Sequence, residues 1–348
     1  MNETQKFIFG EVELENPHFE NWSNVERYME PIIPYYLKDG VEEIFIDRFD
    51  KIIIRQDCKN ILTDCRFDTE QHLLDFLDQL AKSNGLNFGR HSPMIDVRFP
   101  DRSRGNLLFY NVSPNGISAT IRVASKNRFT PQDLLNRDVI SKEMLEYISK
   151  VIEMESNVVI SGGMGSGKTT LMNVVSAFIP DDVRVVSCED TQELFLYVAF
   201  HQPIEAPGKN EANITFEDLL VNSLRMGPNR IWAGEIRNAS AAYQFFKMLN
   251  VGHSGCLTTL HAKNALYALK RICYLCTEQT RIDPSVFKED LCDLVDVFVH
   301  AEMRPEFGRK IIQIAEMQNG QMVDVFTYDK KAGQFKQNEQ ALKNSKYV

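Results

Sequence analysis

The stretch "SGGMGSGKTTLMN", residues 161–173, places four glycines and a single lysine directly after the apolar run Val158-Val159-Ile160. It matches the phosphate-binding pattern Gly162-x-x-x-x-Gly167-Lys168-Thr169, set between a buried strand and a helix that begins near Thr169. Glycines let the backbone curl so that N–H groups face phosphate oxygens, while Lys168 reaches the β/γ-phosphates and the Thr169 hydroxyl ligates Mg²⁺. A glycine-rich structural turn is the alternative. We therefore expect ATP and Mg²⁺ at Gly162, Gly163, Met164, Gly165, Ser166, Gly167, Lys168, Thr169 and Thr170.

Length and composition indicate a soluble protein of about two domains. The 348 residues are 43% hydrophobic and 25% charged, and no run approaches the roughly 18 apolar residues of a membrane span. The amino terminus lacks the pattern of a signal peptide, and seven cysteines without framework spacing favour a reducing cytosol. A net charge of −9 disfavours broad electrostatic binding of nucleic acid. We expect a cytoplasmic protein with no stable nucleic-acid partner.

The pattern of apolar residues changes along the chain and predicts an α/β protein with two domains. Residues 1–130 alternate short strands with a helix over 73–81, which is typical of an α+β domain. Residues 131–140 are expected to form a linker. Over 141–330, buried strands alternate with helices and predict a mostly parallel sheet covered by helices on both faces. Residues 331–348, rich in Lys, Gln and Asn, are expected to form a frayed polar tail.

Acidic residues follow two of the predicted parallel strands. Strand 184–188 runs into Glu189 and Asp190, and strand 230–234 runs into Glu235. In an open α/β sheet the ligand lies beyond the carboxyl ends of the strands, so these carboxylates are expected to face the phosphates. One carboxylate can hold Mg²⁺ and another can deprotonate the attacking water. Solvated acids without a role are the alternative for each.

Four blocks resemble the type II/IV secretion ATPase superfamily: "SGGMGSGKTT", "SCEDTQEL", "LRMGPNRIWAGEIR" and "GHSGCLTTLHA". The family calls them Walker A, Asp box, atypical Walker B and His box. "ATIRVAS" and "EEIFIDRFDKIIIR" resemble the amino-terminal domain of its conjugation and type IV secretion branch, which is closely related to Tad pilus ATPases. The resemblance implies a RecA-like P-loop domain behind a smaller α+β domain.

The resemblance also assigns roles to individual acids and histidines. Glu235 takes the role of catalytic base, and Glu189 manages Mg²⁺ and water, so the metal ligands are expected to be Thr169 and Glu189. His253 and His261 match the two His-box histidines, with His261 the one expected at the γ-phosphate. Asp190 is expected beside the nucleotide.

Four arginines match family positions that stabilise the charge of phosphoryl transfer. Arg225, Arg230 and Arg237 lie in the third block, and Arg122 in "ATIRVAS" resembles the amino-terminal arginine that reaches the nucleotide. A surface ion pair is the alternative for each. In the family such arginines act within a ring, so some are expected to complete a neighbouring subunit's site.

The resemblance implies a homohexamer that docks on membrane components of its apparatus, peripheral to the cytoplasmic face of the inner membrane. ATP would draw the two domains together, and hydrolysis would release them to drive substrate export or pilus assembly. Alternatives are a Tad-type or other type IV pilus assembly ATPase, a nucleic-acid translocating motor, and a scaffold that binds ATP without hydrolysing it.

Three features depart from the family pattern or have no assigned role. Ser240 stands where many relatives carry a glutamate, and residues 194–214 form a loop-like stretch without an assigned function. Cys273-x-x-Cys276 suggests zinc, but a second CxxC is missing from the sequence. Two partly buried helical thiols are therefore the favoured interpretation.

Overall fold

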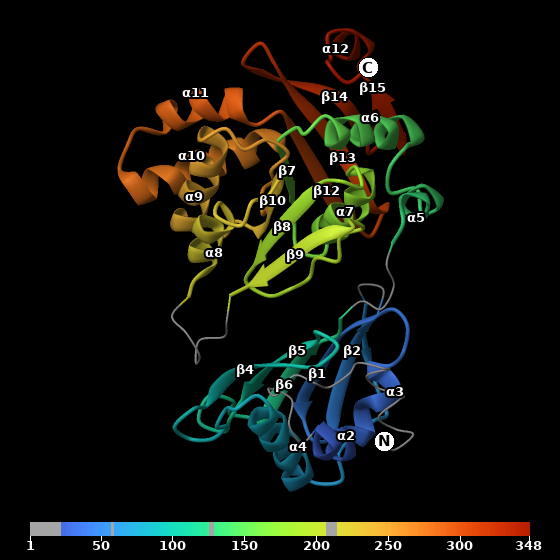
Figure 1. Ribbon diagram of the computed structural model, residues 1–348. Coiled ribbons are helices and arrows are strands. Elements are labelled where there is room, and N and C mark those ends of the chain that lie inside the picture. The colour runs from blue at the N-terminus through green and yellow to red at the C-terminus, as the bar shows by residue number, and fades with distance from the viewer. Residues whose placement is uncertain (1–21, 57–58, 125–128, 207–213) are drawn as a thin grey trace. The chain divides into compact units, whose positions relative to one another are not determined.

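The computed structural model describes residues 22–56, 59–124, 129–206 and 214–348 (Figure 1). The chain divides into two compact units, Met1–Asn127 and Arg128–Val348. Each has its own hydrophobic core. Within the described residues, no helix is both long and apolar enough to span a bilayer.

The first unit is an antiparallel sheet with helices, as the alternation in its sequence predicts. Its described strands follow the order β3-β2-β1-β6-β5-β4. Three helices, one of them extended by a 3₁₀ turn at Glu30–Ile32, share the core with this sheet. The elements are α2 (Trp22–Met29), α3 (Ile33–Tyr36), β1 (Val41–Arg48), β2 (Lys51–Gln56), β3 (Lys59–Leu62), α4 (Glu70–Ser83), β4 (Met94–Arg98), β5 (Arg104–Leu108) and β6 (Ser118–Arg122).

The second unit is built on a mixed sheet that is mostly parallel. Its described strands follow the order β15-β14-β13-β12-β7-β11-β10-β8-β9, parallel from β12 to β9 and antiparallel from β12 to β15. The strands are β7 (Val158–Gly162), β8 (Arg184–Glu189), β9 (Phe200–Glu205), β10 (Arg230–Glu235), β11 (Leu257–Leu260), β12 (Val297–Arg304), β13 (Gly308–Gln318), β14 (Gln321–Asp329) and β15 (Gln334–Gln337).

Helices cover both faces of this sheet, because successive side chains of each buried strand point to opposite faces. On β7, Val158 and Ile160 pack with α6 and α7, whereas Val159 packs with α8 to α11. The fold predicted for this part, an α/β domain with a mostly parallel covered sheet, is confirmed (Figure 1). The helices are α5 (Pro131–Asn136), α6 (Lys142–Glu153), α7 (Lys168–Val175), α8 (Phe216–Ser223), α9 (Ala239–Asn250), α10 (Ala265–Thr280), α11 (Pro284–Leu294) and α12 (Glu339–Lys343).

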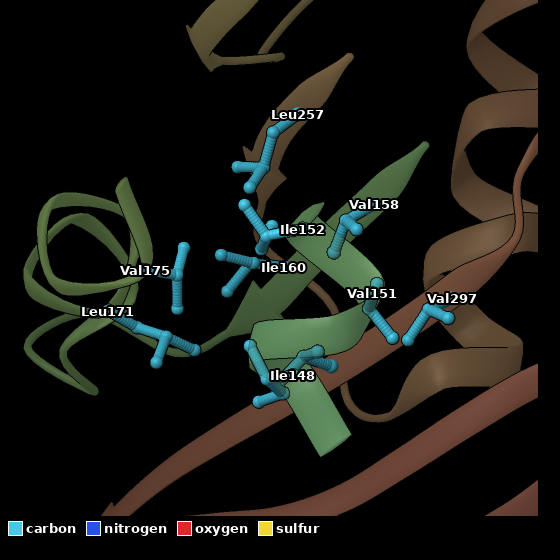
Figure 2. A pocket seen from close by; sticks show the side chains of 10 residues that line it. Ile148, Val151, Ile152, Val158, Ile160, Leu171, Val175, Leu257 and Val297 are labelled. Carbon is cyan, nitrogen blue, oxygen red and sulfur yellow. The ribbon is translucent and has the colours of Figure 1, made fainter. Parts of the chain in front are cut away.

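A cavity lies under β7, between the sheet and helices α6 and α7 (Figure 2). Its lining side chains are all aliphatic, so they offer phosphate no hydrogen-bond donor. The cavity is therefore part of the core and not the nucleotide site. Its lining consists of Ile148, Val151, Ile152, Val158, Ile160, Leu171, Val175, Leu257, Val297 and Val299.

Three segments differ from the sequence-based expectation. Residues 131–140 are not a separate linker, because Leu134 and Ile140 belong to the core of the second unit. The polar tail is not frayed: it forms β15 and α12, and the buried Tyr347 hydroxyl lies 2.7 Å from Ser156 Oγ. In the stretch 194–214, residues 200–205 form β9, whose Pro203 is tolerated because β9 is the edge strand. Residues 207–213 lie outside the described residues.

Candidate active site

The glycine-rich loop connects β7 to α7, as its sequence predicts. Gly165 and Gly167 have φ of 68° and 93°, the left-handed region that favours glycine. Gly162 has another reason to be glycine, since a Cβ there would lie 2.4 Å from both the Ala301 carbonyl oxygen and Ser166 Oγ. Ser166 Oγ donates to the Gly163 carbonyl at 2.9 Å, and Lys168 Nζ donates to the same oxygen at 2.9 Å. These contacts hold the loop curled around Lys168.

His261 connects the carboxylate at the end of β10 to this loop. Its Nε2 lies 3.1 Å from Glu235 Oε1, and its Nδ1 lies 3.0 Å from the Gly162 carbonyl oxygen and 3.4 Å from Lys168 Nζ. The parallel register explains the meeting, because Leu260 on β11 pairs with Ser161 on β7. The structure thus brings Lys168, His261 and Glu235 together, which is the arrangement expected for acting on a terminal phosphate.

Arg237 joins the ends of β8 and β10. Its guanidinium lies 3.1 Å from Glu235 Oε2 and 3.6 Å from Asp190 Oδ2. The Arg237 side chain is 56% exposed, so this pairing contributes little to stability. An exposed guanidinium at this position can instead exchange a carboxylate partner for phosphate oxygens.

Glu189 is buried and fixes the turn that follows β8. Its Oε1 accepts hydrogen bonds from the backbone N–H groups of Glu193, at 2.8 Å, and Leu194, at 3.0 Å. A Cβ on Gly234 would lie 3.1 Å from Glu189 Cγ, so the glycine on β10 leaves room for this carboxylate. The turn places Glu193 Oε2 3.5 Å from Thr169 Oγ1.

Glu193 is therefore a candidate site residue that the sequence pattern alone did not single out. Its only sequence signal was its place inside the "SCEDTQEL" block, where Glu189 and Asp190 drew the assignment. Carboxylate and hydroxyl oxygens are the ligands that Mg²⁺ takes, so Thr169 with Glu193 or Glu189 has suitable chemistry. Within the described residues, no three His, Cys, Asp or Glu side chains cluster as a metal site of their own.

Two residues predicted for the site lie at the amino-terminal ends of their strands, whereas the glycine-rich loop follows the carboxyl-terminal end of β7. Arg230 is the first residue of β10, about 16 Å along the strand from Glu235. It is 1% exposed and donates to the Ile152 carbonyl at 2.5 Å. His253 precedes β11 at the same amino-terminal edge. Neither residue therefore reaches the glycine-rich loop of its own chain from the strand end that carries it, and their roles at the nucleotide stay predictions. The third and fourth blocks each span a whole strand, so their residues lie at both ends of that strand.

The remaining predicted residues stay predictions. Arg225 is exposed in the connection from α8 to β10, on the amino-terminal side of β10. Arg122 ends β6 of the first unit. No contact of Arg225 with the glycine-rich loop is seen among the described residues.

Two further side chains contact the loop or the strand that leads into it, and neither was predicted. His300 on β12 is buried, with Nδ1 2.8 Å from Ser161 Oγ, and burial lowers the pKa of His300 to about 4. Arg309 on β13 donates from Nε to the Gly165 carbonyl at 2.9 Å. The register of β12 against β7 and β13 determines which side chains reach the loop.

The paired cysteines lie in the interior of the second unit. Cys273 and Cys276 lie one turn apart on α10. Both side chains are buried in the core that helices α8 to α11 form with one face of the sheet. Burial raises the pKa of Cys273 to about 11 and that of Cys276 to about 12. Both side chains are therefore neutral thiols that pack as small apolar groups.

The sequence is similar to those of known proteins. An uncharacterized protein of Methanocaldococcus jannaschii is 31% identical over 229 residues, 63% of this chain, and the match spans only 32% of that protein. The type IV secretion system protein VirB11 of Bartonella henselae is 28% identical over 290 residues, covering 72% of this chain and 80% of VirB11.

The fold also matches that of a solved structure. The Legionella pneumophila ATPase DotB superposes with a TM-score of 0.61 at 18% identity, over 84% of this chain and 81% of DotB. A family model described as Type II/IV secretion system protein matches residues 19–295, well over half of the sequence. The resemblance noted in the four sequence blocks is thereby confirmed, and the chain belongs to the type II/IV secretion system protein family.

Proposed function

We propose that this chain is an ATP hydrolase that couples hydrolysis to substrate export by a type IV secretion or conjugation apparatus. The observation that carries the proposal is the meeting of Lys168, His261 and Glu235 at the glycine-rich loop. Membership of the secretion family and the likeness to the type IV secretion protein VirB11 support the cellular role.

Each residue has a distinct part in the proposed reaction. The loop N–H groups and Lys168 hold the β- and γ-phosphates. Glu235 takes a proton from the attacking water. His261 Nε2 lies 3.1 Å from that carboxylate, and His261 connects it to the phosphate-binding loop. Arg237 neutralises charge that develops on the γ-phosphate oxygens. Thr169 with Glu189 or Glu193 would hold Mg²⁺, which would act as a Lewis acid on the phosphate oxygens.

The direct test is the variant Glu235→Gln. It keeps the size of the side chain and a hydrogen bond to His261 while removing the base, so we expect phosphate release to fall by about 10²–10⁴-fold. Binding of a fluorescent ATP analogue should stay within a few-fold of wild type. Wild-type turnover in Glu235→Gln would refute the assignment, and an inactive wild-type protein that still binds ATP would instead indicate a nucleotide-dependent scaffold.

The proposed assembly is a homohexamer that docks on membrane components at the cytoplasmic face of the inner membrane. Arg225 is exposed and lies away from its own loop, which suits a residue that completes a neighbour's site. Size-exclusion chromatography with light scattering, with and without ATP, tests the ring. Stimulation of the ATPase by DNA would favour a nucleic-acid translocating motor instead.

A further inference from the structure

Arg309 makes a contact with the glycine-rich loop from outside the four family blocks. It lies near the start of β13, just after the turn that connects β12 to β13, and its Nε donates to the Gly165 carbonyl at 2.9 Å. A Cβ on Gly167 would lie 3.8 Å from Arg309 Cδ, so the aliphatic stem of the arginine borders the loop as well.

The peptide unit that Arg309 contacts lies in the loop that is expected to bind the phosphates. The bond that carries the Gly165 carbonyl also carries the N–H of Ser166, and in such loops successive N–H groups face the anion. A cation at the carbonyl oxygen polarises the peptide unit toward that oxygen. The N–H of the same peptide unit then carries more positive charge and is a stronger hydrogen-bond donor. The same bond fixes the carbonyl of Gly165, whose φ of 68° lies in the left-handed region.

The backbone of Arg309 is held firmly, so the contact needs little ordering when a nucleotide binds. Arg309 pairs with Met303 on β12, and β12 runs beside β7, where Ala301 pairs with Gly162. The next residue, Lys310, is buried and its Nζ lies 2.6 Å from Asp138 Oδ2. These contacts tie the start of β13 to the strand that leads into the loop.

We propose that Arg309 is a positioning residue for the triphosphate. It presets the loop at Gly165 and adds positive charge beside the phosphates, and thereby raises nucleotide affinity without taking part in the chemical step. The inference rests on the proposed function, since it needs a nucleotide in the loop. Its signature is a change in KM and in the dissociation constant with little change in kcat.

The test compares Arg309→Ala, Arg309→Lys and the control Arg304→Ala. Arg304 lies on the other side of the same turn, is 60% exposed and pairs with Glu302 at 3.4 Å. For Arg309→Ala we expect the dissociation constants of ADP and of a fluorescent ATP analogue, and the KM for ATP, to rise about tenfold, the usual effect of losing a charged hydrogen bond. The kcat should stay within about twofold, and Arg309→Lys should recover most of the affinity because it keeps the charge.

The outcomes separate this inference from the proposed function. Unchanged affinity in Arg309→Ala would overturn the positioning role, as would a fall in kcat at constant KM, or an equal loss in Arg304→Ala. Thermal melting without nucleotide shows whether Arg309→Ala folds. If it does not, Arg309→Gln, which removes the charge and keeps most of the side chain, takes its place: ADP binding about tenfold weaker than wild type supports the role, and unchanged ADP affinity overturns it. If the wild type bound nucleotide but did not hydrolyse it, the proposed ATPase activity would be refuted while the positioning role of Arg309 could still be tested by binding.

Discussion

Substituting Gly162 by alanine should damage the loop in a way that the same change at Gly163 does not. An added Cβ at position 162 would lie 2.4 Å from the backbone oxygen of Ala301 and from Ser166 Oγ. Real Cβ contacts stay beyond 3.0 Å, so both neighbours must move by more than half an ångström. The Ser166 hydroxyl can rotate, but the Ala301 oxygen belongs to β12 and can move only with the strand.

Overpacking of this kind costs about 1–3 kcal/mol. At roughly 3 °C per kcal/mol for a unit of this size, Gly162→Ala should lower the melting temperature of the nucleotide-free protein by about 3–9 °C. At Gly163 an added Cβ meets nothing within 4 Å, and φ is not positive, so Gly163→Ala should melt within about 1 °C of wild type. Differential scanning fluorimetry without nucleotide measures both. Equal melting temperatures for the two variants would refute the reasoning.

Three other predictions follow from individual side chains. Arg230→Met should keep ATP hydrolysis within about threefold of wild type, whereas Arg237→Ala should lower it at least tenfold; phosphate release measures both, and the reverse order would contradict the placement of these arginines at opposite sheet edges. Burial holds His300 neutral with a pKa of about 4, below its usual 6.5, so its contribution to stability is full above pH 6.5 and falls between pH 6.5 and 4. Between pH 6.5 and 4 the free energy of unfolding, measured in urea, should fall by about 2–3 kcal/mol more for the wild type than for His300→Gln. Equal falls for the two proteins would refute this. Tyr347→Phe should destabilise by about 1 kcal/mol in urea unfolding, because it removes the bond to Ser156, and no change would show that the carboxyl-terminal segment is not packed there.

The glycine-rich loop, its flanking strand and helix, and the acids at the strand ends could be predicted from the sequence, because each depends on residues that lie close together along the chain. A parallel strand carries its carboxyl-terminal residue to the ligand edge, so Glu235 at the end of β10 and His261 just after β11 could be placed beside Lys168. The same rule places Arg230, the first residue of β10, and His253, which precedes β11, at the amino-terminal ends of those strands. Only the match to the family blocks assigns these two residues to the site.

Other features depend on tertiary register and had no local signal. Glu193 reaches Thr169 only because Glu189 folds the turn after β8. Arg309 reaches Gly165 only because β13 pairs with β12 beside β7. The carboxyl-terminal residues were judged by average polarity, yet a few apolar groups such as Tyr347 are enough to pack a short strand and helix.

The most direct test of the account is a structure of Glu235→Gln bound to Mg²⁺ and ATP. We predict the β- and γ-phosphates in the loop of residues 162–169, with Lys168 Nζ and the side chain at position 235 both within reach of the γ-phosphate, directly or through one water. A nucleotide bound elsewhere, or a γ-phosphate more than about 7 Å from the side chain at position 235, beyond the reach of a single bridging water, would contradict it.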